Sequence, residues 1–272
     1  MFWLAAEESA KPVLGFLAPG KVAQCFTMII MLLLVYIMIQ RAKAGLPTRQ
    51  IRKIPGLDAV DEAIGRATEM GRAVHFSPGL GGVSNPATFA AWAFLSYIAR
   101  LCASYDTRLI NTNRDYLVHS INEEIIRQSY LEAGRPEAYN PDDVRWLSDS
   151  QFAYATGVLG LFEREQPAAN IMIGYFYAES MLFAEAGAIS GAIQIAGTTN
   201  TTQLPFFVAS CDYTLLGEEI YAASAYISKE PVLIGSVVGQ DLGKMLVLVI
   251  IILGTILENV TEENVLRTLL KM

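Results

Sequence analysis

A glycine-rich segment at residues 78–85 (PGLGGVSN) has the residue types and spacing best suited to binding a ligand. It follows an apolar run, AVHFS, that predicts a strand, and it precedes a run that predicts a helix. In that context, glycines let backbone N–H groups and a helix N-terminus approach an anion such as phosphate. Ser84 occupies the third glycine position of a GxGxxG dinucleotide motif, and the Gly-Lys-Ser/Thr of a Walker A loop is missing. The segment therefore predicts either a nucleotide- or phosphate-binding turn or a tight structural loop.

Further candidate ligand-binding residues lie where expected strands end. In an open parallel sheet, ligands bind outside the carboxyl ends of the strands, and Asn111 and Asp212 are expected at two of those ends. Asn, Asp and Ser at such positions are also typical N-caps of helices, so each has a structural alternative. The candidate ligand-binding residues are Gly79, Gly81, Gly82, Ser84, Asn85, Asn111 and Asp212.

Residues suited to catalysis or to binding a metal are few. The chain has two histidines, His75 and His119, and three widely separated cysteines, without a CxxC, HExxH or GxSxG motif. His75 lies within an expected strand, which favours an internal hydrogen-bonding role. Two carboxylates in an apolar stretch, Glu179 and Glu185, are spaced too far apart to share a helical face as an i, i+4 pair would. We assign no catalytic residue, no metal site and no particular cofactor.

The composition indicates a membrane protein. Hydrophobic residues make up 53% of the 272-residue chain and charged residues only 17%, against about 25% charged in soluble proteins. Residues 22–39 (VAQCFTMIIMLLLVYIMI) carry no charge, and as a helix they would extend about 27 Å, close to the thickness of a bilayer's hydrocarbon core. The preceding stretch contains Glu7 and Glu8 rather than the basic region of a cleaved signal peptide. We expect an interfacial segment over residues 1–21 and a transmembrane helix over 22–40.

A second membrane helix is expected near the C-terminus. Residues 245–257 (MLVLVIIILGTIL) are uncharged but too short to span a bilayer alone, so the helix is expected to begin at Val232. The extension contains Gly235, Gly239 and Gly243, a ladder on one helical face that allows close helix packing in lipid. A buried hairpin or a peripheral helix is the alternative. We expect the second helix over residues 232–258 and an amphipathic tail over 259–272.

The flanking charges predict an orientation. Basic residues crowd the C-terminal side of the first apolar segment, and only Lys11 and Lys21 precede it. The crowded set is Arg41, Lys43, Arg49, Arg52 and Lys53. By the positive-inside rule, the N-terminus lies outside the cell membrane, residues 41–54 form a basic juxtamembrane connector, and the following domain is cytoplasmic.

Residues 55–230 predict an α/β domain: a mostly parallel sheet with helices on both faces, in a Rossmann-like arrangement. Short β-rich runs alternate with longer helical runs, which is typical of such sheets. The expected strands cover residues 73–77, 108–111, 144–147, 170–176, 192–196 and 204–210. The last run, LPFFVAS, is assigned as a strand because it is continuously apolar, and residues 215–227 are assigned as the helix that follows it.

The run DEAIGRATEMGRAVHF at residues 61–76, together with the PGLGG that follows shortly after it, resembles a family of uncharacterised prokaryotic membrane proteins of a domain-of-unknown-function class. The resemblance is sharpest over residues 57–82 and extends through the layout of the chain. It implies an N-terminal anchor ahead of an α/β domain, and a glycine-rich loop that recurs in that domain. It implies no activity and no site residues.

Two functions are consistent with these features. The first is a membrane-anchored structural or assembly protein that self-associates through its α/β domain and its glycine-rich membrane helix. The alternative is a membrane-tethered sensor or enzyme that binds a nucleotide or another anion at residues 79–85. Expected partners are the lipid bilayer, further copies of the chain and other membrane proteins. The net charge of −7 and the lack of a basic, aromatic-rich patch disfavour nucleic acid, and a transporter is disfavoured because neither apolar segment carries a central charge.

Overall fold

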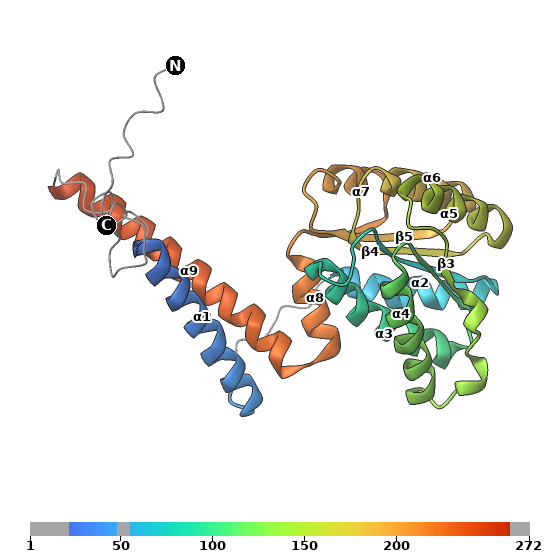
Figure 1. Cartoon of the computed structure of the whole chain (residues 1–272), viewed down its shortest axis with the longest axis horizontal. Coiled ribbons are helices and arrows are strands. Elements are labelled where there is room, and N and C mark those ends of the chain that lie inside the picture. Colours follow the sequence, from blue (N-terminus) through green and yellow to red (C-terminus); the bar gives the residue numbers. More distant parts are fainter. Residues whose placement is uncertain (1–21, 48–54, 262–272) are drawn as a thin grey trace, which may run out of the picture. The chain divides into compact units, whose positions relative to one another are not determined.

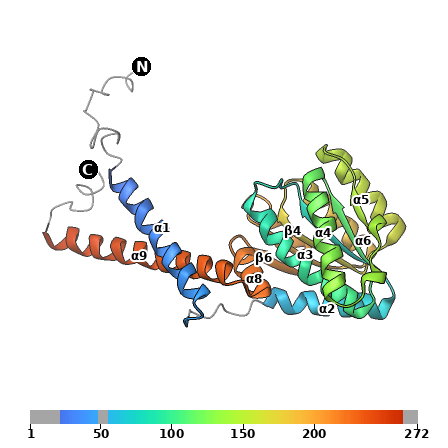
Figure 2. The ribbon, with the colours of Figure 1, turned by 60° about the horizontal axis from the view of Figure 1, so that its bottom comes forward.

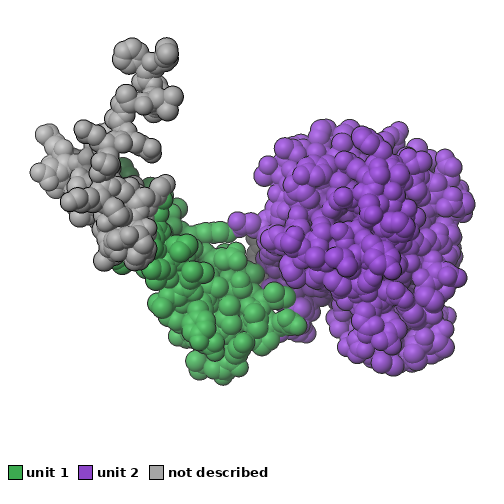
Figure 3. Space-filling view, viewed as in Figure 1, with its two compact units in different colours: residues 1–50, 230–272 green, residues 51–229 purple. Residues whose placement is uncertain are grey.

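The computed structural model describes residues 22–47 and 55–261, which form two compact units (Figures 1 and 3). Helices α1 (Val22–Lys43) and α9 (Pro231–Thr261) belong to one unit, and the elements between them form the other. The expected interfacial segment at residues 1–21, the second half of the connector and most of the C-terminal tail lie outside the described residues.

The second unit is built on a six-stranded parallel sheet with the strand order β3-β2-β1-β4-β5-β6. Its strands are β1 (Val74–Gly79), β2 (Leu109–Asn113), β3 (Val144–Trp146), β4 (Ala169–Tyr175), β5 (Ile193–Thr198) and β6 (Tyr213–Leu216). One face is covered by α2 (Pro55–Met70), α3 (Pro86–Tyr105), α4 (Tyr116–Glu132) and α8 (Glu219–Ser228), and the other by α5 (Gln151–Glu165), α6 (Glu179–Ser190) and α7 (Leu204–Ser210) (Figure 2). Two short 3-10 turns, Pro136–Ala138 and Pro141–Asp143, lead into β3. The predicted parallel α/β architecture is confirmed.

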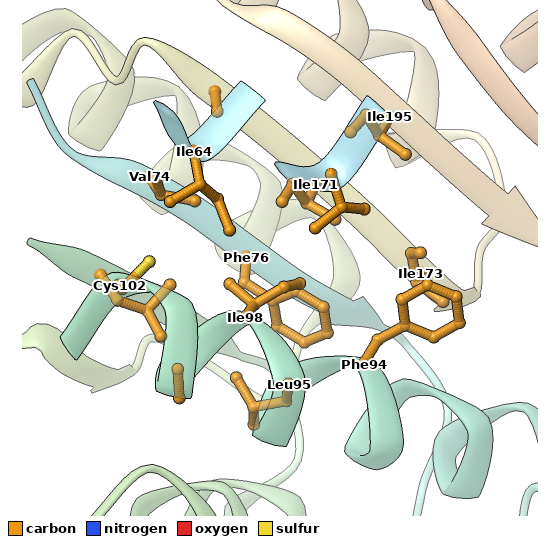
Figure 4. Packing of buried hydrophobic residues seen from close by; sticks show 14 of the residues in the cluster. Ile64, Val74, Phe76, Phe94, Leu95, Ile98, Cys102, Ile171, Ile173 and Ile195 are labelled. Atoms are coloured by element: carbon orange, nitrogen blue, oxygen red, sulfur yellow. The ribbon is translucent and has the colours of Figure 1, made fainter. Parts of the chain in front are cut away.

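Most of the core under the first face is aliphatic. Phe94, Leu95 and Ile98 of α3 are fully buried in the same cluster as Phe76 and Ile171 of the central strands (Figure 4). Because α3 is largely enclosed in this way, its apolar composition is explained by burial between the sheet and its neighbouring helices.

The prediction of a sixth strand over residues 204–210 was wrong. This run is helix α7, with Pro205 in its first turn. Backbone N–H groups in the first turn make no intrahelical hydrogen bond, so a proline, which lacks the N–H, loses none there. Only Phe207 is buried, whereas Phe206 and Val208 are exposed, so the run is covered on one side. The sixth strand is β6, whose last two residues fall in the stretch assigned to a helix, and α8 begins only at Glu219. A seven-residue apolar run has no periodicity that separates a strand from a buried helix.

Helices α1 and α9 pack side by side along the glycine ladder (Figures 1 and 2). A Cβ atom added to Gly235 would lie 2.6 Å from the Cα of Ile39, and one added to Gly239 would lie 2.8 Å from the Cα of Val35. A Cβ atom on Gly243 would collide with the side chain of Met31. Successive glycines of α9 contact successively earlier residues of α1, so the two helices are antiparallel. The ladder is therefore occupied by α1 of the same chain.

Three helices of the described residues are long and apolar enough to cross a membrane: Gln24–Lys43, Pro86–Tyr105 and Pro231–Ile256. The second of these is α3, in the domain core, and the other two belong to the α1/α9 pair. Most large apolar side chains of that pair are exposed, including Leu32, Leu33 and Ile251 at more than half of their area.

A row of hydrogen-bonded polar side chains crosses the second face of the sheet. Gln194 on β5, Asn170 on β4 and His75 on β1 lie in register, and each is buried. The Nδ2 of Asn170 donates to the Oε1 of Gln194 at 3.1 Å, and the Nδ1 of His75 lies 2.8 Å from the Oδ1 of Asn170. The row continues from the Nε2 of His75 to the hydroxyl of Thr112 at 2.9 Å. Gly187 of α6 makes room for the row, because a Cβ there would collide with Gln194.

His75 is neutral in this row. An amide oxygen only accepts, so Nδ1 of His75 carries the proton and Nε2 accepts from the hydroxyl of Thr112. Burial away from water lowers the pKa of His75 from 6.5 to about 4, against a smaller opposing effect of the hydrogen bond to Asn170. The histidine therefore has an internal structural role.

This pKa shift predicts that acid destabilises the domain. As the pH is lowered from 7 to 4, the unfolded chain takes up a proton at His75 and the folded chain largely does not. The free energy of unfolding therefore decreases by about 3 kcal/mol from this group. We expect His75→Gln to be less stable at pH 7 and to lack this component. The measurement is urea unfolding of the detergent-solubilised chain followed by tryptophan fluorescence, with Arg127→Gln, at an exposed position of α4, as control. Equal losses of stability in the wild type and His75→Gln would contradict the assignment.

Candidate functional site

The glycine-rich loop joins β1 to α3 and is held against the end of β4. The N–H of Leu80 donates to the carbonyl of Tyr175 at 2.7 Å. Gly79 has a φ of +78°, and a Cβ there would collide with the same carbonyl. From the other side, Gly174 has a φ of +151° and lies against the carbonyl of Pro78. The carboxyl ends of β1 and β4 are thus joined by backbone contacts that only glycine permits.

Two further residues of the loop have structural roles at the start of α3. A Cβ on Gly81 would lie 2.5 Å from the hydroxyl oxygen of Thr88. Asn85 is the N-cap of α3, and its Oδ1 accepts from the N–H of Ala87 at 2.9 Å. The tight structural loop, which the sequence left open as an alternative, accounts for Gly79, Gly81 and Asn85.

The remaining part of the loop has free hydrogen-bond donors. Among the described residues, no acceptor is hydrogen-bonded to the N–H groups of Gly81, Gly82, Val83 and Ser84. Ser84 is exposed, and Gly82 has room for a side chain, with the Oδ2 of Asp115 3.4 Å from where its Cβ would be. Consecutive free N–H groups beside a helix N-terminus are the arrangement that binds anions.

A cation adjoins these donors. Arg114, which follows β2, donates from Nη1 to the carbonyl of Leu80 at 2.9 Å and from Nε to the carbonyl of Asp149 at 2.8 Å. No carboxylate of the described residues lies within ion-pair distance of Arg114. Asp115, next in the chain, caps α4 by accepting from the N–H of Val118 at 3.0 Å. The loop thus faces one uncompensated positive charge and one carboxylate.

Buried polar atoms without partners lie in the first halves of α3 and α4, two helices that pack against each other. The hydroxyl of Thr88 and the Oδ1 of Asn122 belong to fully buried side chains and bond to no described residue. The Nε1 of Trp92 and the Nδ1 of His119 are likewise unpaired among the described residues. Each such atom costs about 1–3 kcal/mol unless water or a ligand satisfies it. No sequence motif announces these residues.

Asn111 is not available to a ligand in this structure. Its Nδ2 donates to the carbonyl of Phe76 at 3.2 Å, and its Oδ1 accepts from Asn113 at 2.6 Å and from Asn122 at 3.2 Å. All three amides are fully buried. They form a hydrogen-bonded cluster that ties β2 to β1 and α4.

Asp212 lies at the opposite edge of the sheet from the glycine loop. It precedes β6, and its Oδ2 accepts from the N–H of Gln194, near the start of β5, at 2.8 Å. The expectation that Asp212 ends a strand was wrong because the run before it is helix α7. Asp212 therefore does not join the candidate site.

Of the two carboxylates in the apolar stretch, Glu179 is buried and Glu185 is exposed. Glu179 is the first residue of α6 and accepts from the N–H of Tyr177 at 2.8 Å and from the Nε2 of Gln151 at 2.7 Å. These bonds, together with the helix N-terminus, stabilise its charge. Glu179 joins the loop after β4 to α5.

Two cavities, of about 310 and 290 Å³, open at the amino edge of the sheet. Both are lined by Asp106, Thr107 and Arg108. The guanidinium of Arg108 is committed to Asp143, from Nη2 at 2.6 Å, and to Glu165, from Nη1 at 2.7 Å, and these contacts lower the pKa of Glu165. The ion pairs stabilise the start of β2 and β3 and leave little capacity for a charged ligand.

Large apolar side chains gather at the carboxyl edge. Several lie in the first turn of a helix or directly after a strand, and each is between 43% and 75% exposed. They are Phe89, Tyr116, Leu117, Trp146, Phe152, Tyr177 and Met181. Exposed apolar groups gathered in this way are typical of interaction surfaces.

Comparison with known proteins yields a family and nothing closer. No curated protein and no solved structure matches the chain. Residues 14–269 match a protein family described as a domain of unknown function, DUF6754, across both the α1/α9 unit and the α/β unit. The chain therefore belongs to the DUF6754 family.

Proposed function

We propose that this chain is an integral membrane protein with a structural or assembly role. The α1/α9 hairpin carries this proposal: two long apolar helices from opposite ends of the chain pack on a glycine ladder, and their outer side chains are large and apolar. In water that surface would be costly, whereas in a bilayer it is the expected one. The hairpin anchors the α/β domain to a cell membrane.

Antiparallel packing favours one topology. The chain leaves α1 and returns into α9 at the same end of the hairpin, so a hairpin that spans the bilayer has the whole α/β domain on one side. Arg41 and Lys43 in the last turn of α1 favour a cytoplasmic location for that end. The residues before α1 and after α9 then lie outside.

The domain supports the assembly role through its carboxyl edge. The strand order 3-2-1-4-5-6 is that of doubly wound, Rossmann-like sheets, whose ligands bind where the order reverses, between β1 and β4. Here the backbones of β1 and β4 meet at that point, and the exposed apolar groups around it favour docking of another protein or another copy of the chain.

Thiol labelling tests the topology. In a chain with Cys25, Cys102 and Cys211 replaced by alanine, we expect a membrane-impermeant maleimide to label Ser9→Cys and Lys271→Cys in intact cells. We expect Ser120→Cys, at an exposed position of α4, to be labelled only after the membrane is permeabilised. Labelling of Ser9→Cys and Lys271→Cys from opposite sides would show that the helices are not a spanning hairpin.

Anion binding at the glycine loop is a second candidate function. The observation that favours it is the set of free N–H groups at residues 81–84 beside Arg114, with the unpaired hydroxyl of Thr88 against Gly81. A phosphate group placed there would receive backbone donors and a guanidinium. Cofactor identity stays open, because phosphate is shared by many nucleotides.

Pyrophosphate titration tests this second function. We expect inorganic pyrophosphate to bind the detergent-solubilised chain, and Arg114→Gln and Gly82→Asp each to weaken binding by at least about tenfold through lost or opposed charge. Gly82 is the suitable loop position because a side chain fits there, whereas one at Gly81 would not. Arg127→Gln, which removes an exposed arginine paired with Glu124 on its own helix, is the control. Calorimetry showing no binding, or equal binding by Gly82→Asp, would exclude the site.

A further inference from the structure

Helix α9 carries a polar stripe on the side opposite the glycine ladder. The stripe consists of Gln240, Asp241 and Lys244, all exposed. At about 100° per residue these three positions fall within an arc of roughly 100°, centred about 150° from the centre of the ladder. The Nε2 of Gln240 approaches the hydroxyl of Ser236 only at 3.5 Å, and Asp241 has no hydrogen bond or ion pair with any described residue.

The packing register sets the depth of this stripe. Gly235 meets Ile39, Gly239 meets Val35 and Gly243 meets Met31. Continuing that register places Asp241 level with Leu33 and Lys244 level with Ile30, in the middle of the uncharged stretch of α1. At 1.5 Å per residue, Asp241 lies about 9 Å and Lys244 about 14 Å inside the boundary marked by Ile39.

The stripe cannot be placed in water by assuming a membrane boundary deeper along the hairpin. If Lys244 lay at the boundary, the α1 residues from Met31 to Ile39 would be in water as well. Leu32 and Tyr36 are each 62% exposed and Leu33 is 58% exposed, so a large apolar surface would be wetted. The two helices are fixed to one another, so α1 holds the stripe of α9 within the hydrocarbon region.

We propose that this stripe is the surface through which the hairpin binds a second copy of itself inside the membrane. The inference rests on the proposed insertion of the hairpin in the bilayer. Polar and ionisable groups at that depth are costly, and they are met by other polar groups across helix interfaces. The sequence analysis expected self-association through the glycine ladder, but α1 of the same chain already occupies it. The polar stripe is therefore proposed as the membrane surface for self-association instead.

Charge complementarity selects a second copy as the partner. The stripe contains one acid and one base three residues apart, a rise of about 4.5 Å. Copies share one orientation in the membrane, so a two-fold axis along the membrane normal brings Asp241 toward the partner's Lys244 twice. Gln240 both donates and accepts, so it can bond to its counterpart in the partner. The contact is self-complementary, as a two-fold interface requires.

Rescue in trans tests the pairing. Two tagged versions of the full chain are co-expressed, and co-purification through one tag is measured in mild detergent. We expect wild-type chains to co-purify, and Asp241→Lys chains or Lys244→Asp chains to co-purify with their own kind roughly five- to thirtyfold less. In a mixture, the Asp241→Lys chain has a doubly positive stripe and the Lys244→Asp chain a doubly negative one. The two stripes attract each other, so the two variants are expected to co-purify with one another. A pair within one helix could not produce that recovery.

The outcomes separate this inference from the proposed function. Membrane insertion is measured independently for every variant by resistance to carbonate extraction, with Gln24→Lys on α1 as the charge-adding control that leaves pairing unchanged. Inserted wild-type chains that do not co-purify, variants that pair as well as the wild type, or a mixture that does not recover would each overturn the pairing while leaving the anchor intact. Extraction of the wild-type chain by carbonate would overturn both.

Discussion

The close contact of α1 with α9 is the constraint on which the hairpin depends. In lipid, two apolar helices gain nothing from hiding from water, so their association relies on backbone approach and van der Waals packing. Gly235, Gly239 and Gly243 supply that approach over three successive turns, because each lies so close to a residue of α1 that an added Cβ would collide with it. The contact brings α1 and α9 together and, in the proposed membrane hairpin, sets the depth of Asp241 and Lys244.

The α/β domain shows a different use of glycine and of buried polar groups. Gly79 and Gly174 let the ends of β1 and β4 meet, at the place where many doubly wound sheets hold a ligand. Beneath the second face, the row through His75 and Asn170 satisfies its hydrogen bonds internally, which specifies a single register of the strands. The hydroxyl of Thr88, which stays unpaired among the described residues, lies beside Gly81 of the glycine-rich loop.

Periodicity and strand composition were enough to predict the parallel α/β architecture and the first five strands to within a few residues. They failed at residues 204–210, because an apolar run of that length is equally compatible with a strand and with a helix buried on one side. The error moved β6 and placed Asp212 at the wrong edge of the sheet. Residues that pack against this run but are distant in sequence determine whether it forms a strand or a helix.

The glycine-rich loop lies between a strand and a helix, as the sequence predicted, but the contacts of the candidate residues were not predictable. Asn111 is enclosed by Asn113 and Asn122, and a single sequence does not reveal which amides will meet. The ladder was recognised as a packing surface, but its partner α1 is distant in sequence and could not be identified from the pattern. The polar stripe was not recognised from the sequence, because its depth in the proposed hairpin follows from the register with α1 and not from α9 alone.

The most direct test of this account measures how far apart the two helices lie when the ladder is filled. Spin labels at Leu32 and Leu242, two exposed positions level with each other, report the separation by double electron–electron resonance in a cysteine-free chain in nanodiscs. We expect Gly239→Leu to lengthen and broaden the distance, as the helices relax toward the separation of about 8–10 Å usual for larger side chains. Gly65→Ala, where nothing lies within 4 Å of the added Cβ, leaves it unchanged. An unaltered distance in Gly239→Leu would contradict the hairpin.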